Sequence, residues 1–167
     1  ATFRHEMYAA YKGTRKDLDV ELKTQFPIVR EYLDARGIVR YEEAGIEADD
    51  IIGSFVKAHP ELQIHILSSD RDLLQLIGKN SIVHLMKKGI TQLEEMNETS
   101  LLESMQLTPA QIIDMKALMG DSADNIPGIK GIGEKTALKL LHSYGSIESL
   151  YEHIDEIKGK MKEKLEA

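Results

Sequence analysis

One apolar strand and the helix before it constrain the fold of this chain more than any other feature. Residues 63–67 read QIHIL, a short β-branched run typical of a buried strand. A helical pattern spans 48–58, and Ile38–Tyr41 before it has the composition of another strand. Strands joined through a helix pair in parallel with a right-handed crossover. The sequence therefore predicts an α/β fold with a small, mostly parallel sheet flanked by helices.

The rest of the chain divides into two expected domains. The first, 1–96, adds helices to this α/β core and ends in an expected hairpin, and the second, 97–167, has a helical pattern throughout. In the second part a capping box with proline begins one helix and a glycine ends it. The expected elements are helices at 3–15, 18–36, 48–58, about 109–119 and 134–144, strands at 38–41 and 63–67, and a hairpin of 82–86 with 90–94.

Composition excludes several classes of site but not a nucleic-acid partner. The 167 residues include no cysteine, which rules out disulfides, thiolate metal sites and cysteine nucleophiles. No apolar run is long enough to cross a bilayer, so we expect a cytoplasmic monomer without a membrane partner. The net charge of −7 could be carried entirely by clustered carboxylates, which bound divalent cations would offset.

Seven carboxylates gather in three clusters close to the ends of predicted elements. Mg²⁺ and Mn²⁺ prefer oxygen ligands, and a site with two such ions about 4 Å apart needs several carboxylates. Helix capping is the alternative for any single cluster. The three clusters together favour a metal site made from Glu47, Asp49 and Asp50, from Asp70 and Asp72, and from Asp121 and Asp124.

A glycine-rich turn follows the last cluster and leads into a helix. Its glycines allow close backbone approach, and amide groups with the helix dipole favour an anion such as a DNA phosphate. A tight helix connection is the alternative, but lysines and a threonine around the turn favour contact with a DNA backbone. The predicted contacts are Gly128, Lys130, Gly131, Gly133, Lys135, Thr136 and Lys139.

A basic and aromatic stripe near the start of the chain is ambiguous alone. Arg4, Tyr8, Tyr11, Lys12 and Arg15 would share one face of a helix. By itself such a stripe is typical of an ordinary solvated surface.

Five ordered motifs remove much of this ambiguity. In order and spacing they resemble the 5′-3′ exonuclease, or flap endonuclease, domain of bacterial DNA polymerase I across essentially the whole chain. The motifs are Phe3-Arg4-His5-Glu6, Tyr11-Lys12-Gly13-Thr14-Arg15, Gly45-Ile46-Glu47-Ala48-Asp49-Asp50, Ser69-Asp70-Arg71-Asp72 and Gly120-Asp121-Ser122-Ala123-Asp124-Asn125-Ile126-Pro127-Gly128.

This resemblance implies a nuclease core of the PIN-like kind, with the remnant of a helical arch, followed by a helix-hairpin-helix lobe. It implies that the seven clustered acids hold two Mg²⁺ or Mn²⁺ ions and that Lys12 and Arg15 act at the scissile phosphate. Arg4, Tyr11 and the hairpin would contact DNA, and a K⁺ ion could sit at the hairpin. The implied reaction is hydrolysis of DNA with a 5′ flap, or with a 5′ end at a duplex junction, in replication and repair.

One departure from the family and two alternatives qualify this interpretation. The family carries two further acids that would precede Ala1, so we expect a core without its first strand. A non-catalytic duplex-binding fragment is therefore one alternative. A phosphatase of the haloacid-dehalogenase type is the other, but it leaves Glu47–Asp50 unused and requires a hydroxyl residue where Leu74 stands.

Overall fold

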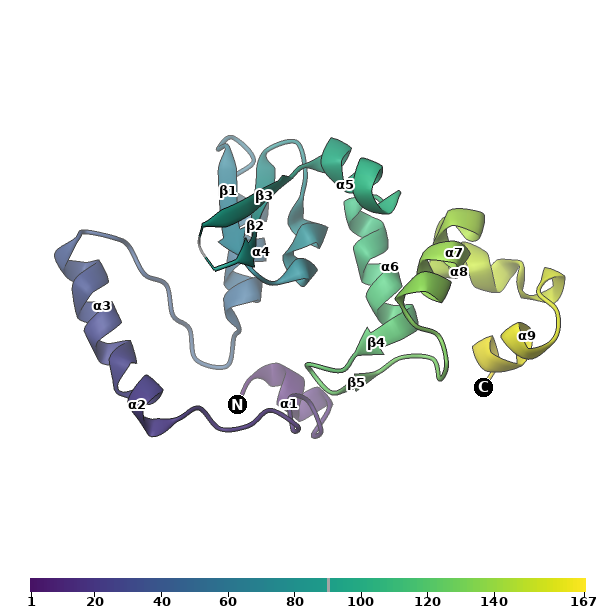
Figure 1. Cartoon of the computed structure of the whole chain (residues 1–167), viewed down its shortest axis with the longest axis horizontal. Coiled ribbons are helices and arrows are strands. Elements are labelled where there is room, and N and C mark those ends of the chain that lie inside the picture. The colour runs from purple at the N-terminus through teal and green to yellow at the C-terminus, as the bar shows by residue number, and fades with distance from the viewer. Residues whose placement is uncertain (90) are drawn as a thin grey trace.

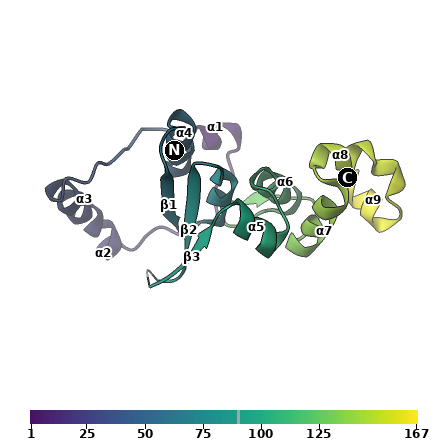
Figure 2. The same ribbon diagram turned by 90° about the horizontal axis from the view of Figure 1, so that it is seen from above.

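The computed structural model describes residues 1–89 and 91–167 (Figure 1). A three-stranded sheet lies at the centre of an elongated molecule. One helical segment stands off on one side, and a helical lobe lies at the other end (Figures 1 and 2). The elements in chain order are α1 (Phe3–Met7), α2 (Val20–Lys23), α3 (Gln25–Ala35), α4 (Ala48–Ala58), β1 (Ile64–Ser68), the 3₁₀ helix η1 (Arg71–Leu76), β2 (Ser81–Lys88), β3 (Gln92–Met96), α5 (Glu98–Met105), α6 (Pro109–Met119), β4 (Gly120–Asp121), β5 (Ile126–Pro127), α7 (Glu134–Tyr144), α8 (Ile147–Glu152), the 3₁₀ helix η2 (Ile154–Glu156) and α9 (Lys160–Leu165).

The sheet is mixed, with β2 in the middle. β1 pairs with β2 in parallel, from Ile64 opposite Ser81 to Ser68 opposite Leu85. β2 pairs with β3 in antiparallel fashion, which confirms the predicted hairpin. The predicted second strand of that hairpin began at Ile90, which lies outside the described residues. The 3₁₀ helix η1 lies between the two parallel strands in the chain. Asp70 and Asp72 follow β1 directly, at its carboxyl end, where ligands of such sheets gather.

A continuous apolar cluster joins the sheet to the helical lobe. Val83 of β2, Leu118 of α6 and Leu141 of α7 are each at most 1% exposed and belong to this cluster. The cluster also includes residues of η1, α5 and α8. The lobe is therefore packed directly onto the core that carries the acidic clusters.

The helix boundaries of the second half follow the sequence signals closely. Thr108 and Gln111 form the capping box at the start of α6, and Gly120, with φ +74°, ends that helix. Gly145 ends α7, and the Ser146 hydroxyl accepts from Ser149 N at the start of α8. Together α6, the β4–β5 hairpin and α7 form the predicted helix-hairpin-helix arrangement.

Three expectations for the first half were wrong. Ile38–Tyr41 forms no strand, and its Ile38, Val39 and Tyr41 side chains are at least half exposed. The helix expected over 3–15 ends at Met7, and turns follow it. The helix expected over 18–36, with a kink or restart at Pro27 and an end at Gly37, restarts instead at Thr24 to give α2 and α3 and ends at Ala35, and neither helix contains a buried residue.

Helix α4 has the predicted bounds of 48–58.

Within the described ranges, no helix has both the length and the apolarity needed to cross a bilayer.

Candidate functional site

The first group of charged side chains lies where the turn after α1 meets the β4–β5 loop. Lys12 Nζ donates to Glu47 Oε2 at 2.7 Å and lies 3.9 Å from Asp124 Oδ2. The Tyr11 hydroxyl lies 2.9 Å from the same Glu47 oxygen and 3.0 Å from Asp124 Oδ2. Arg15 donates to Asp124 Oδ1 at 2.5 Å. Two carboxylates from distant parts of the chain are thus held together by two cations and a buried tyrosine.

Unusual backbone conformations fix this group in place. Lys12 and Asn125 have φ of 54° and 57°, in the left-handed region that non-glycine residues rarely adopt. Lys12 N donates to Asp124 O at 2.8 Å, and Asn125 Nδ2 donates to Ala10 O at 2.7 Å. Such residues cost about 1–3 kcal/mol each and cluster at functional sites. The two loops therefore hold each other in a conformation that stability alone does not favour.

The charges in this first group reinforce one another. Burial would raise the pKa of Glu47, but hydrogen bonds from Lys12 and Tyr11 outweigh it, and that pKa is lowered. Burial would lower the pKa of Lys12, but its hydrogen bonds with Glu47 and Tyr11 prevail and raise it. Burial raises the pKa of Tyr11 to about 12. At neutral pH, Glu47 is therefore an anion, Lys12 a cation and Tyr11 an uncharged donor.

The second group is centred on Lys116 of α6. Lys116 Nζ lies 2.7 Å from Asp72 Oδ1 and donates to Asp121 Oδ2 at 2.9 Å. Asp121 Oδ1 accepts from Ala123 N at 2.8 Å and from Asp124 N at 3.2 Å, which connects this group to the first. Two of the predicted clusters therefore meet around one lysine.

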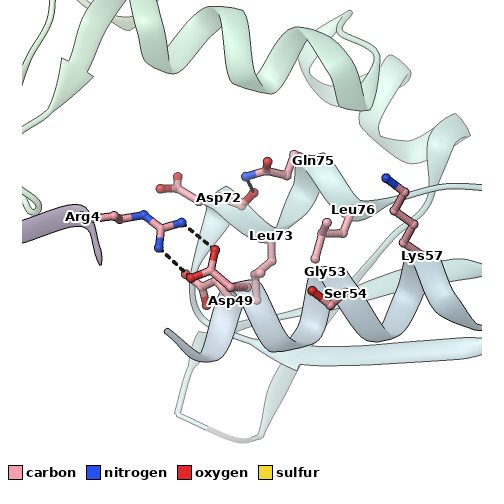
Figure 3. Close-up of a pocket in the computed structure, with 10 residues that line it drawn as sticks. Arg4, Asp49, Gly53, Ser54, Lys57, Asp72, Leu73, Gln75 and Leu76 are labelled. Atoms are coloured by element: carbon pink, nitrogen blue, oxygen red, sulfur yellow. Dashed lines mark hydrogen bonds and ion pairs between the residues drawn. The ribbon is translucent and has the colours of Figure 1, made fainter. Parts of the chain in front are cut away.

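The third group lies at the start of α4. Arg4 forms a bidentate pair with Asp50, at 2.6 and 2.7 Å. Glu47 N also donates to Asp50 Oδ2 at 3.1 Å, which completes a capping box. A cavity of about 330 Å³ opens between α4 and η1. Figure 3 shows Asp49 and Asp72 on facing elements of this cavity, with Arg4 reaching in from α1.

Two carboxylates that line this cavity have raised pKa values. Burial raises the pKa of Asp49, and the neighbouring charge of Asp70 adds to this effect. Burial also raises the pKa of Asp72, although Lys116 partly offsets it. Asp72 Oδ1 is buried without a hydrogen-bond partner, because Lys116 lies close to it but out of line. An oxygen of this kind fits the requirements of a hard cation.

The carboxylates are not arranged as a preformed metal cage. Across residues 1–89 and 91–167, no three carboxylate or imidazole groups are placed to hold one metal ion. Arg4, Lys12, Arg15 and Lys116 instead neutralise the acids in pairs. The donor chemistry suits Mg²⁺ or Mn²⁺, and binding would require these side chains to give way.

The glycine-rich turn extends directly from the acidic site. β4 pairs with β5, with Gly120 opposite Pro127 and Asp121 opposite Ile126. A Cβ at Gly120 would lie 2.2 Å from Gly128 N, so this crossing requires glycine. The turn continues to Gly133, which begins α7. The predicted DNA contacts at Lys130, Gly131, Gly133, Lys135 and Lys139 are exposed, while Gly128 and Thr136 are half-buried.

The sequence analysis named neither Lys116 nor Lys164 as a site residue, although basic residues concentrate in 158–164. Lys116 stands in the last turn of α6, five residues before Asp121, and this proximity to the Gly120-Asp121 motif was the available signal. Lys164 contacts the hairpin from α9, 33 residues further along the chain. No local pattern identifies such a contact.

Solved structures of known proteins share this fold. The T5 5′-exonuclease, in a structure with divalent zinc ions bound, is 26% identical, with a TM-score of 0.77 over 99% of this chain and 65% of that one. The catalytic core of Rad2 in complex with a DNA substrate is 18% identical, with a TM-score of 0.59 over 97% of this chain and 53% of that one. The predicted nuclease-type α/β fold is confirmed.

Curated relatives are more similar in sequence. DNA polymerase I of Streptococcus pneumoniae strain R6 is 52% identical over 98% of this chain, and that of Bacillus subtilis strain 168 is 50% identical over 99%. In both cases the matched part is 19% of the relative. The chain thus spans about a fifth of the length of these polymerases.

Family assignments cover the chain from end to end. Residues 1–106 match the 5′-3′ exonuclease N-terminal resolvase-like domain, and residues 107–167 match the 5′-3′ exonuclease C-terminal SAM fold. Neither match supports the phosphatase alternative. The chain, with its acidic groups and its exposed hairpin, belongs to the 5′-3′ exonuclease family.

Proposed function

We propose that this chain binds DNA at a junction and hydrolyses a phosphodiester near a 5′ end or flap. The observation that carries the proposal is the direct connection between the acid groups and the hairpin. Asp121 pairs with Ile126 in the β4–β5 ribbon, and the glycine-rich turn from Pro127 to Gly133, called the hairpin here, follows directly. A duplex held by the hairpin would therefore present its backbone beside the carboxylates.

The acid groups would hold the divalent ions in this proposal. The charges of Asp70 and Asp72 contribute to the raised pKa of Asp49, and those of Asp70 and Asp121 contribute to the raised pKa of Asp72, which supports one shared site. Glu47, Asp50 and Asp124 surround it. Two Mg²⁺ or Mn²⁺ ions supply charge neutralisation and water activation in such sites.

Lys12 and Arg15 have a distinct role in this proposal. In the structure they neutralise Glu47 and Asp124 at the edge of the acid groups. Once bound divalent ions neutralise these acids, Lys12 and Arg15 are free to contact the scissile phosphate. Arginine binds phosphate oxygens in a bidentate manner, and lysine adds a point charge. Together they would orient the phosphate and stabilise its developing negative charge.

Cleavage of a labelled 5′-flap duplex tests this function. We expect Mg²⁺-dependent hydrolysis that EDTA abolishes, and Lys12→Ala should lower the rate about 100-fold or more at saturating DNA. Asp155→Asn is the matched control, because Asp155 pairs with Lys162 on the distant lobe. Binding without cleavage under these conditions would favour the alternative of a non-catalytic duplex-binding fragment. The pairing of the acids with internal cations is the observation that favours this alternative.

The oligomeric state, the location, the DNA structure and the roles of the two domains belong to the same proposal. We infer a monomer that acts in the cytoplasm on DNA with a 5′ flap or with a 5′ end at a duplex junction. A K⁺ ion at the hairpin is consistent with its exposed turn. The assignment of 1–96 to the catalytic core and of 97–167 to the duplex-binding lobe completes the proposal.

A further inference from the structure

A groove beside the hairpin is not explained by the contacts predicted from sequence. It has a volume of about 800 Å³ and lies between the hairpin and α9. Gly128, Lys130 and Gly131 line one side, and Lys160 and Lys164 line the other. The groove therefore continues the hairpin surface that we propose to bind DNA.

Lys164 connects the two sides of this groove. Its Nζ donates to Gly131 O at 3.0 Å. Gly131 has φ +79°, a backbone conformation that other residues rarely adopt, and a Cβ there would lie 2.7 Å from Lys164 Nζ. The buried Leu165 anchors α9, and the Tyr151 hydroxyl donates to Leu165 O at 2.9 Å. Lys164 is thus held by packing rather than left as a free surface side chain.

The groove carries positive charge that the protein does not neutralise. Within the described part of the chain, Lys130, Lys160 and Lys164 have no carboxylate partner. Lys162 on the same helix differs, since it pairs with Asp155 at 2.6 Å and lies 3.7 Å from Glu166. Glu163 is an acidic side chain at the groove, and it is exposed to solvent. The lysines therefore outnumber the acids where the groove meets the hairpin.

The hairpin backbone adds donors to these lysines. In the ranges that the structure describes, the amides of Lys130 and Gly131 donate to no backbone or side-chain acceptor. Amide groups of a tight turn together with lysines form a suitable site for an anionic oxygen. Lys164 also covers the Gly131 carbonyl, which would otherwise repel an anion in the groove.

We infer that this groove binds a backbone phosphate of duplex DNA, one contact beyond the hairpin, with Lys160 and Lys164 as its cations. The inference rests on the proposed function, because it extends the same DNA surface. Lys164 acts as both a phosphate contact and a positioning residue for the hairpin. Recognition is independent of base sequence, since every donor is a lysine or a backbone amide.

The test is the salt dependence of binding to a duplex with a 5′ flap, measured in EDTA so that cleavage is excluded. The slope of log K against log salt is negative, and each lost phosphate contact lowers its magnitude by about 0.9. Lys160→Ala and Lys164→Ala should each lower the slope by about this amount for any base sequence. Lys162→Ala is the matched control on the same helix and should leave the slope unchanged.

Two reference variants separate this inference from the proposed function. Lys130→Ala and Lys135→Ala alter the hairpin site itself and should each lower the slope by about one. A lowered slope for these variants with no change for Lys160→Ala and Lys164→Ala would overturn the groove and leave hairpin binding intact. Failure of the unaltered chain to bind the duplex would overturn both.

A structural role alone for Lys164 gives a different result. Lys164→Ala would then lower affinity or thermal stability at an unchanged slope, and the exposed Lys160→Ala would have no effect. This pattern would contradict the inference. A slope change for Lys160→Ala with unaltered thermal unfolding would support it, because an exposed lysine leaves the fold intact.

Discussion

Residues 1–60 and residues 64–167 are held in place by different forces. Among the described residues of the first region, Tyr11 is the only buried hydrophobic one. Helices α2 and α3 contain no buried residue. Ion pairs of Lys12 and Arg15 with Asp124 connect this region to the second region, and Ile52 and Val56 of α4 pack against the apolar cluster. The second region surrounds a continuous apolar cluster.

This difference has a consequence for the site. Apolar packing is insensitive to salt and to charge neutralisation, whereas exposed ion pairs are weakened by both. The hairpin lobe should therefore stay folded under conditions that release Lys12 and Arg15 from Asp124. Ions or DNA at the site would change the position of Lys12 and Arg15 more than that of the hairpin.

The largest expected effect comes from the apolar cluster. Leu118→Ala removes a side chain that is 1% exposed, and we expect a loss of about 3 kcal/mol in the free energy of unfolding. Ile28→Ala on α3 is the matched control, since Ile28 is 64% exposed and should change stability by less than about 0.5 kcal/mol. Urea unfolding measures both. Similar losses would show that the contrast between the two regions is wrong.

A smaller effect is expected from the first ion-pair group. Glu47→Gln leaves Lys12 facing an uncharged amide, and the local free energy that holds the turn around Lys12 should fall by about 1–3 kcal/mol. Hydrogen exchange should accelerate there and remain unchanged in α6 and α7. Glu42→Gln is the control, because that exposed pair with Arg30 and Arg40 contributes little. Uniform acceleration over the whole chain would contradict this prediction.

The smallest effect is a pH dependence with two opposing parts. The pKa values of Asp49 and Asp72 are raised by burial, so their cost to stability is relieved as the pH falls toward the ordinary value of 3.8. The Arg4 hydrogen bond lowers the pKa of Asp50, and that of Asp121 is lowered because Lys116 outweighs burial. Their stabilisation is present above that value and is lost as the pH falls through their lowered pKa values.

Thermal unfolding without metal should therefore vary little from pH 7 to pH 5 and decline steeply below pH 4. Asp49→Asn should raise the unfolding temperature at pH 7, because it removes a charge that burial disfavours. A lower unfolding temperature for this variant would show that Asp49 is compensated in a way the structure does not contain.

Local signals predicted the second half of the chain well. The capping box at Thr108 and the glycines at 120 and 145 identified α6 and α7 because each acts on its own helix end. The strand expected at Ile38–Tyr41 failed for the opposite reason. A strand needs a hydrogen-bonded neighbour, and this segment has none among the described residues.

The sequence predicted that the acids share one site, but not which cations pair with them. Paired spacing identified the carboxylates, and the structure brings Asp72 and Asp121 to one lysine. Sequence alone could not show that Lys116 would occupy that place. Nor could it show that Lys12 N donates to Asp124 O within the turns that follow α1. Both depend on contacts between segments that are distant in sequence.

Binding of Mn²⁺, followed by electron paramagnetic resonance without DNA, tests the central claim most directly. If the acid groups form a divalent-ion site, the unaltered chain binds Mn²⁺, and Asp72→Asn and Asp121→Asn lose most of that binding. Lys116→Met should bind the ion more tightly, because the cation between these two acids is gone. Asp155→Asn should bind like the unaltered chain. Equal binding by all these variants would contradict the account.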